Sequence, residues 1–116
     1  MKATNEALDA GIEATKPGNT ADDVAQKFWA VLDKYGIKKE SRTGYSIGIG
    51  YPPDWGEQTL NISKGDKTIL KPNVTFHMIA VMQFGEWGVE ASESVRVTEK
   101  GSELFCNLSR DLHIKR

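Results

Sequence analysis

The stretch VTFHMIAVMQF at residues 74–84, followed by GEWG at 85–88 and VEASESVRVT at 89–98, decides the fold of this chain. The first segment is an apolar run of the kind that forms a β-strand, and the last places Val95 and Val97 on one face by alternation. A short connection that contains glycine is typical of an antiparallel hairpin. This region therefore predicts two paired strands.

The residues before the hairpin predict two helices. Leu8 and Ile12 lie one helical turn apart in an alanine-rich segment, and Pro17 lies in the KPGN stretch that ends it. Thr20 is typical of an N-cap, and Gly36 ends the second helix. One apolar face of that helix is formed by Ala21, Val24, Phe28, Val31, Leu32 and Tyr35.

The remaining segments are short strands and turns. Residues 44–50 alternate small and larger residues, which favours a strand that another backbone approaches closely. Residues 51–57 cannot be regular, since Pro52 and Pro53 remove two backbone donors. Turns are expected at 64–66, 71–73 and 99–101, and a last strand at 102–105. Helices followed by an antiparallel sheet predict an α+β fold, in a single domain that spans residues 1–116.

Composition excludes several classes of protein. The chain has 116 residues with 15 basic and 16 acidic side chains, so its formal charge of −1 argues against nucleic acid binding. No apolar run approaches the roughly 20 residues that span a bilayer, which argues against a membrane partner. The N-terminus lacks the apolar core of a signal peptide, and a single cysteine, Cys106, cannot form an internal disulfide. We therefore expect a cytoplasmic protein.

The order of motifs carries a family resemblance. The motifs are KPGNT at 16–20, GYSIG at 44–48, KPNVTF at 71–76 and ESVRVTEKG at 93–101. In this order, over residues 1–110, they resemble the second half of the catalytic domain of the creatinase/aminopeptidase P/methionine aminopeptidase family, the pita-bread fold. The stretch SRTGYSIGIGYPPDWGE at 41–57, with FHM at 76–78 and SES at 92–94, resembles the ectoine hydrolase branch.

The departures from the family pattern bear on chemistry. Family peptidases hold two metal ions with two aspartates, a histidine and two glutamates, and both aspartates lie in the half that precedes this one. The resemblance places the histidine at Tyr45, the first glutamate at Ile79 and the last at Glu93, one residue out of register. A phenol and an isoleucine cannot replace an imidazole and a carboxylate on a divalent ion. The resemblance therefore implies a hydrolase without metal or other cofactor, which cleaves a C–N bond of a small amidine or amide, ectoine above others.

The resemblance also implies an incomplete catalytic domain, as a natural fragment or a truncated chain. A half-domain exposes the sheet face that would pack against its pseudo-symmetric mate. We expect a homodimer that imitates this arrangement, or pairing with the missing N-terminal half. Two other functions stay open: a non-catalytic pita-bread module for binding or assembly, and a fragment of an Xaa-Pro metallopeptidase.

Three residues are candidate catalytic groups. His77 faces away from its neighbours Phe76 and Met78, and it titrates near neutral pH, as an acid–base group must. Glu93 is an acid within a β run, where a buried carboxylate needs a partner. Tyr45 could donate a hydrogen bond to substrate. The competing interpretations are a hydrogen-bonded strand histidine, an outward-facing glutamate and a packed aromatic.

Five residues are candidate substrate ligands. Trp55 could cover a planar cation, with Asp54 or Glu57 as counter-charge, and Tyr51 belongs to the same proline-led loop. Arg42 could hold a substrate carboxylate. The competing interpretations are a surface loop anchored by a buried Trp55 and a solvated arginine in a turn.

Overall fold

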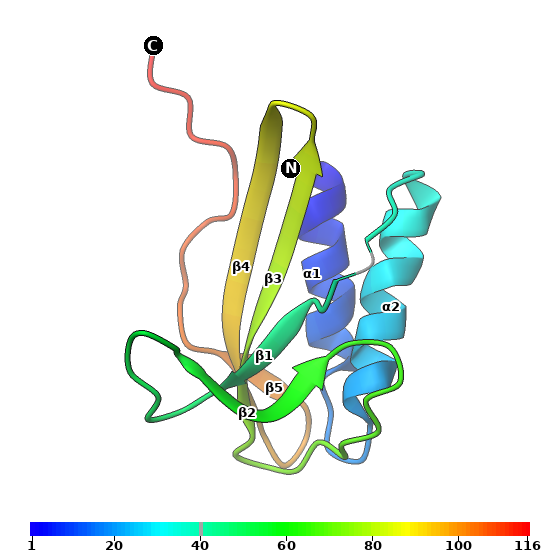
Figure 1. Cartoon of the computed structure of the whole chain (residues 1–116), viewed down its shortest axis with the longest axis vertical. Helices are drawn as coiled ribbons and strands as arrows, with labels where there is room; N and C mark the ends of the chain where they lie inside the picture. The colour runs from blue at the N-terminus through cyan, green and yellow to red at the C-terminus, as the bar shows by residue number, and fades with distance from the viewer. Residues whose placement is uncertain (40) are drawn as a thin grey trace.

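The structure is a computed structural model that describes residues 1–39 and 41–116. Its elements are helices α1 (Lys2–Ala14) and α2 (Ala21–Lys34) and strands β1 (Gly44–Ile47), β2 (Gly56–Ile62), β3 (Thr75–Phe84), β4 (Trp87–Val97) and β5 (Ser102–Leu104). The strands form one antiparallel sheet in the order β2-β1-β3-β4-β5. Both helices pack on the same face of it, which confirms the α+β prediction (Figure 1).

Helix α2 begins where its capping residue predicts. Thr20 accepts a hydrogen bond from the backbone N–H of Asp23 at 3.1 Å, and Asp23 accepts one from the backbone N–H of Thr20 at 2.8 Å. This reciprocal pair satisfies two donors that the first turn would leave unpaired. Tyr35 departs from the expected apolar face, because it lies at the C-cap with 41% exposure and donates its hydroxyl to Glu6 Oε2.

The turn at residues 64–66, which follows β2, is linked to the start of α2 by hydrogen bonds. Asp22 accepts a hydrogen bond from the backbone N–H of Gly65 at 2.9 Å and from the Lys67 ammonium. The Lys67 ammonium is the main reason why the pKa of Asp22 falls to about 2. The expected turn at 64–66 therefore joins the sheet to the helix layer.

The hairpin that decides the fold is tighter than its sequence indicates. Cα partners run in unbroken register from Thr75 and Arg96 to Phe84 and Trp87. Only Gly85 and Glu86 form the turn, and Gly85 takes the left-handed conformation that such a turn requires, with φ +60°. Residues 87 and 88, which we expected in the connection, therefore begin β4.

Two elements differ from expectation around residues 44–62. Strand β1 ends at Ile47, so residues 48–50 leave the sheet. Strand β2 was not predicted, although Leu60 and Ile62 alternate toward the core, and it includes Gly56 and Glu57, which we expected to be irregular. The close backbone approach is confirmed at Gly44, where a Cβ atom would lie 2.7 Å from the carbonyl oxygen of His77.

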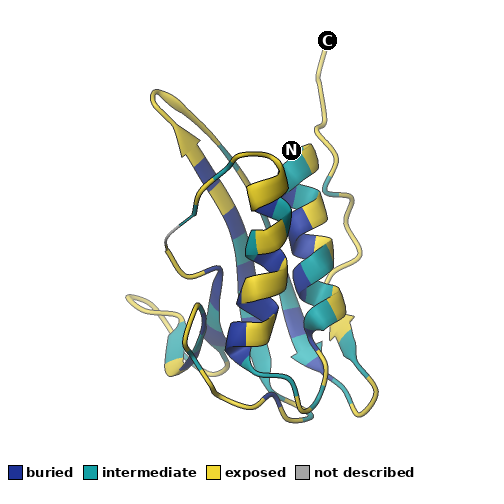
Figure 2. Cartoon of the chain, turned by 90° about the vertical axis from the view of Figure 1, so that its right-hand side faces the viewer, coloured by how far each residue is buried: buried dark blue, intermediate teal, exposed yellow. Residues whose placement is uncertain are grey.

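The core lies between the helices and the sheet (Figure 2). Its largest fully buried side chains include Leu8, Phe28, Leu32, Phe76, Met78, Val95 and Val97. Strand alternation sends the intervening side chains of β3 and β4 to the opposite, open face, where they are half-buried or exposed. No helix within residues 1–39 or 41–116 is long and apolar enough to cross a membrane.

Candidate active site

A row of polar side chains crosses the open face of the sheet. Strand register places Asn61 of β2 beside Tyr45 of β1, Tyr45 beside His77 of β3, and His77 beside Ser94 of β4. Side chains of directly paired residues share one face, so this polar row is built by the pairing of four strands. Each of its members is half-buried.

His77 is the centre of the polar row. Its Nδ1 lies 2.9 Å from Ser94 Oγ, and its ring centroid lies 5.8 Å from that of Tyr45. Burial lowers the pKa of His77 below its usual value, and the negative charge of Glu90 opposes this shift. Burial therefore favours the neutral imidazole, which can accept a proton. The structure thus brings His77 and Tyr45 together, and it adds Ser94.

Arg42 extends the polar row at its outer end. Its guanidinium carbon lies 5.0 Å from the centroid of the Tyr45 ring, and its Nη1 donates to Asn61 Oδ1 at 2.7 Å. The cation–π contact and the hydrogen bond hold the side chain over the open face. Arg42 is itself exposed, so its remaining donors can reach a ligand.

The proline-led loop borders the same face but uses its carboxylates internally. Asp54 accepts hydrogen bonds from the backbone N–H of Gly56 and from Gln58 Nε2, both at 2.8 Å, which lowers its pKa. Glu57 accepts a hydrogen bond from the backbone N–H of Gly50. Trp55 is 60% exposed, so it is not the buried anchor of this loop. Tyr51 is more exposed still, at 83%.

Glu93 lies on the other side of the sheet from His77. Its Cα partner on β3 is Met78, and like Met78 its side chain faces the helix layer, where it is 6% exposed. Its Oε1 lies 3.0 Å from Nε of Arg110, whose guanidinium also pairs with Asp9 of α1. Glu93 therefore does not lie beside His77 and Tyr45 as expected, because strand alternation places it on the opposite face of the sheet.

Sequence reasoning missed three residues that shape the two faces. Ser94 and Asn61 lie in the polar row, and Arg110 neutralises Glu93 from the C-terminal segment. Alternation along residues 92–97 places Ser94 on the opposite face from Val95, so the sequence was sufficient to predict the face of Ser94. The contact between Ser94 and His77 could not be predicted, because it depends on the register of two strands. Arg110 carries no local signal at all.

Comparison with known proteins agrees with the order of elements. Metallopeptidase family M24 matches residues 1–99 of the chain. The chain belongs to the M24 family. Ectoine hydrolase from Halomonas elongata is 43% identical over 111 residues, which are 95% of this chain and 28% of that protein.

Solved structures of peptidases share the fold. A dipeptidase, PepE from Mycobacterium ulcerans, superposes with a TM-score of 0.86 at 29% identity, over 96% of this chain and 29% of its own. A prolidase from Pyrococcus furiosus superposes with a TM-score of 0.84 at 24% identity, over 94% of this chain and 32% of its own. The chain thus spans about a third or less of each of these relatives.

The residues on the open face do not fit the metal ions that the name of the M24 family implies. The resemblance placed a histidine at Tyr45 and a glutamate at Ile79, and Ser92 is the residue that faces Ile79 on β4. A phenol, an alkyl group and a hydroxyl are poor ligands for a divalent ion. Glu93, the one carboxylate that the resemblance kept, points to the helices. Within the part of the chain that the structure describes, no three His, Cys, Asp or Glu residues cluster as ligands.

Proposed function

We propose that this chain forms half of the active site of a metal-independent hydrolase that cleaves a C–N bond in a small amidine or amide. The observation that carries the proposal is the polar row, in which His77 lies between Ser94 and Tyr45 on the open face. The identity of 43% with an ectoine hydrolase favours ectoine, a cyclic amidine with a carboxylate, as the substrate.

The polar row supplies three roles that this hydrolysis needs. Arg42 binds the substrate carboxylate through donors that Asn61 leaves free. His77 takes a proton from water as the oxygen attacks the amidine carbon, and it returns that proton to the nitrogen when the C–N bond breaks. The Tyr45 hydroxyl donates a hydrogen bond to the substrate nitrogen. Glu93 takes no part in this proposal, because it faces the helix layer.

The loop that follows β1, together with the first two residues of β2, forms the rim of the proposed site. Trp55 is exposed and free to cover the amidine plane. Asp54 and Glu57 accept hydrogen bonds from within the loop, and their negative charges offer the counter-charge to the amidine. Tyr51, in the same loop, is proposed as a further contact to substrate.

We propose that a second copy of the chain covers the open face and completes the site. The open face presents half-buried or exposed apolar side chains, such as Ile79 and Val81, next to the polar row. Sedimentation of the chain at micromolar concentration should give a dimer. A monomer would contradict the dimer and favour pairing with an N-terminal half of the domain.

Ligand binding tests the proposed function. Ectoine should raise the melting temperature of the chain, since a ligand that binds the native state stabilises it. His77→Asn and Arg42→Gln should abolish this shift, whereas His113→Asn, in the exposed C-terminal segment, should leave it unchanged. Creatine and Xaa-Pro dipeptides serve as competing ligands. No response to any of them would favour a binding or assembly module, and stoichiometric Mn, Co or Zn in the purified protein would favour a peptidase.

A further inference from the structure

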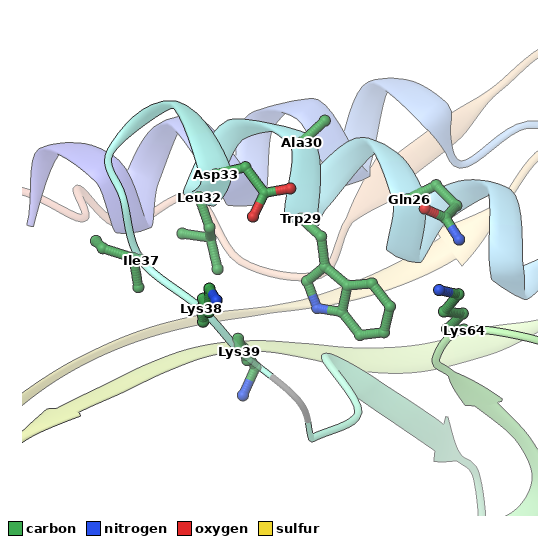
Figure 3. A pocket seen from close by; sticks show the side chains of 9 residues that line it. All are labelled: Gln26, Trp29, Ala30, Leu32, Asp33, Ile37, Lys38, Lys39 and Lys64. Carbon is green, nitrogen blue, oxygen red and sulfur yellow. The ribbon is translucent and has the colours of Figure 1, made fainter.

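A cleft of about 500 Å³ lies on the side of α2, away from the polar row. Trp29, Leu32 and Ile37 give it apolar walls, and Lys38, Lys39 and Lys64 line it with ammonium groups (Figure 3). Its size suits a small organic ligand. None of its lining residues belongs to the polar row or to the proline-led loop.

The indole of Trp29 carries an unused donor. Its Nε1 is buried, and no atom of residues 1–39 or 41–116 accepts a hydrogen bond from it. In Figure 3 the edge of the ring that carries this nitrogen is turned toward the segment with Lys38 and Lys39, and the other edge is turned toward Lys64. A buried N–H without an acceptor is unfavourable, so this donor calls for an acceptor inside the cleft.

The positive charge of the cleft favours an anionic ligand. Three lysines line it, and Asp33 is the acidic side chain among its lining residues. Lys39 is half-buried, and its Nζ donates to Ser41 Oγ at 2.8 Å, which leaves further donors on the ammonium. Burial lowers the pKa of Lys39, and an anion beside it would offset that loss of hydration.

We propose that this cleft binds a small organic carboxylate, whose oxygens accept from Trp29 Nε1 and pair with the Lys39 ammonium. The organic part of the ligand lies against Leu32 and Ile37. A carboxylate suits these groups, because one neutral donor and one ammonium match its two oxygens and its single charge. The proposal is independent of the hydrolase function, since it uses a different side of the molecule.

Nuclear magnetic resonance of the indole groups tests the site with benzoate as the probe. The chain has three tryptophans, and Trp29→Phe identifies the Nε1–H signal of Trp29. Benzoate, added at constant ionic strength, should shift this signal saturably at millimolar concentration and leave the signals of Trp55 and Trp87 unmoved. Neutral benzamide, which has the same shape, should bind about tenfold more weakly, because it cannot form the ion pair.

Two variants separate the proposed site from adventitious binding. Lys39→Met should weaken benzoate binding by about tenfold, whereas Lys100→Met, which removes an exposed lysine from the 99–101 turn, should not change it. The proposal is overturned by the absence of a saturable shift, by equal binding of benzoate and benzamide, or by parallel shifts of all three indole signals. The benzamide comparison needs no variant, so it holds even if Lys39→Met fails to fold.

Discussion

The ionisable residues on the two faces of the sheet have opposite surroundings. Glu93 and His77 lie on neighbouring strands, one register position apart. Glu93 faces the helices and is neutralised by Arg110, whereas His77 faces the open side and has Ser94, Tyr45 and space for a ligand beside it. The face on which a side chain lies, and not its chemical type, decides whether it serves the fold or remains available for chemistry.

The largest difference between the faces is expected for apolar truncation. Phe76→Ala, on the helix-facing side, should lower the free energy of unfolding by about 3–5 kcal/mol, because it opens a cavity in the core. Val81→Ala, on the open side of the same strand, should cost less than about 1 kcal/mol when both variants are measured as monomers at low protein concentration. Urea denaturation followed by circular dichroism measures both. Similar losses for the two variants would mean that the open face is also covered.

Removing the partner of Glu93 should give the next largest effect. Arg110→Met leaves a carboxylate that is 6% exposed without its cation, which should cost about 2–3 kcal/mol. Lys115→Met, in the same exposed segment, serves as the control. The double variant Glu93→Met with Arg110→Met should recover most of the loss, since it removes both charges. If the double variant is as unstable as the single one, the pair is not the cause.

Ser94→Ala tests the polar row with a smaller effect on stability. Loss of the hydrogen bond to His77 should cost about 0.5–1.5 kcal/mol. The change should also alter the proportions of the two imidazole tautomers, which ¹⁵N chemical shifts report. Ser92→Ala is the matched control on the same face. An unchanged tautomer ratio in Ser94→Ala would show that Ser94 does not position the imidazole.

The pH dependence of His77 should be the smallest effect on stability. Burial lowers its folded pKa below the unfolded value of about 6.5, so the unfolded chain binds the proton more readily. Stability should therefore fall as the pH drops from about 6.5 to the folded pKa, and His77→Asn should remove this dependence. Titration of the His77 ring signals measures the pKa. Glu90→Gln should lower it further, and a pKa that rises instead would contradict the role of Glu90.

Local pattern predicted most elements of the fold, and the reasons for the exceptions differ. The 3.6-residue periodicity of α2 and the alternation along β3 were strong signals, because each helix or strand buries one face. Strand β2 was overlooked between a proline-led loop and a turn, where only Leu60 and Ile62 alternate toward the core. The connection at 85–88 was predicted too long, since the register of the hairpin sets its length.

The candidate site was predicted in part for the same reason. Alternation placed His77 opposite to Phe76 and Met78, and the structure confirms that face. Alternation also places Glu93 on the same face as Val95 and Val97. The family resemblance nevertheless led us to predict Glu93 as a catalytic residue. The pattern of the strand was the better guide to Glu93, because a side chain cannot leave its face without a shift of the whole strand.

The amino-acid order alone determined which side of each helix and strand is apolar, because that property depends on neighbours a few residues apart. The tertiary structure decided which polar groups meet. Ser94 reaches His77 and Arg110 reaches Glu93 only after strands pair and the C-terminal segment packs beside α1. Such contacts join residues that are distant along the chain, so no local pattern contains them, and the packing of the core sets the register that creates them.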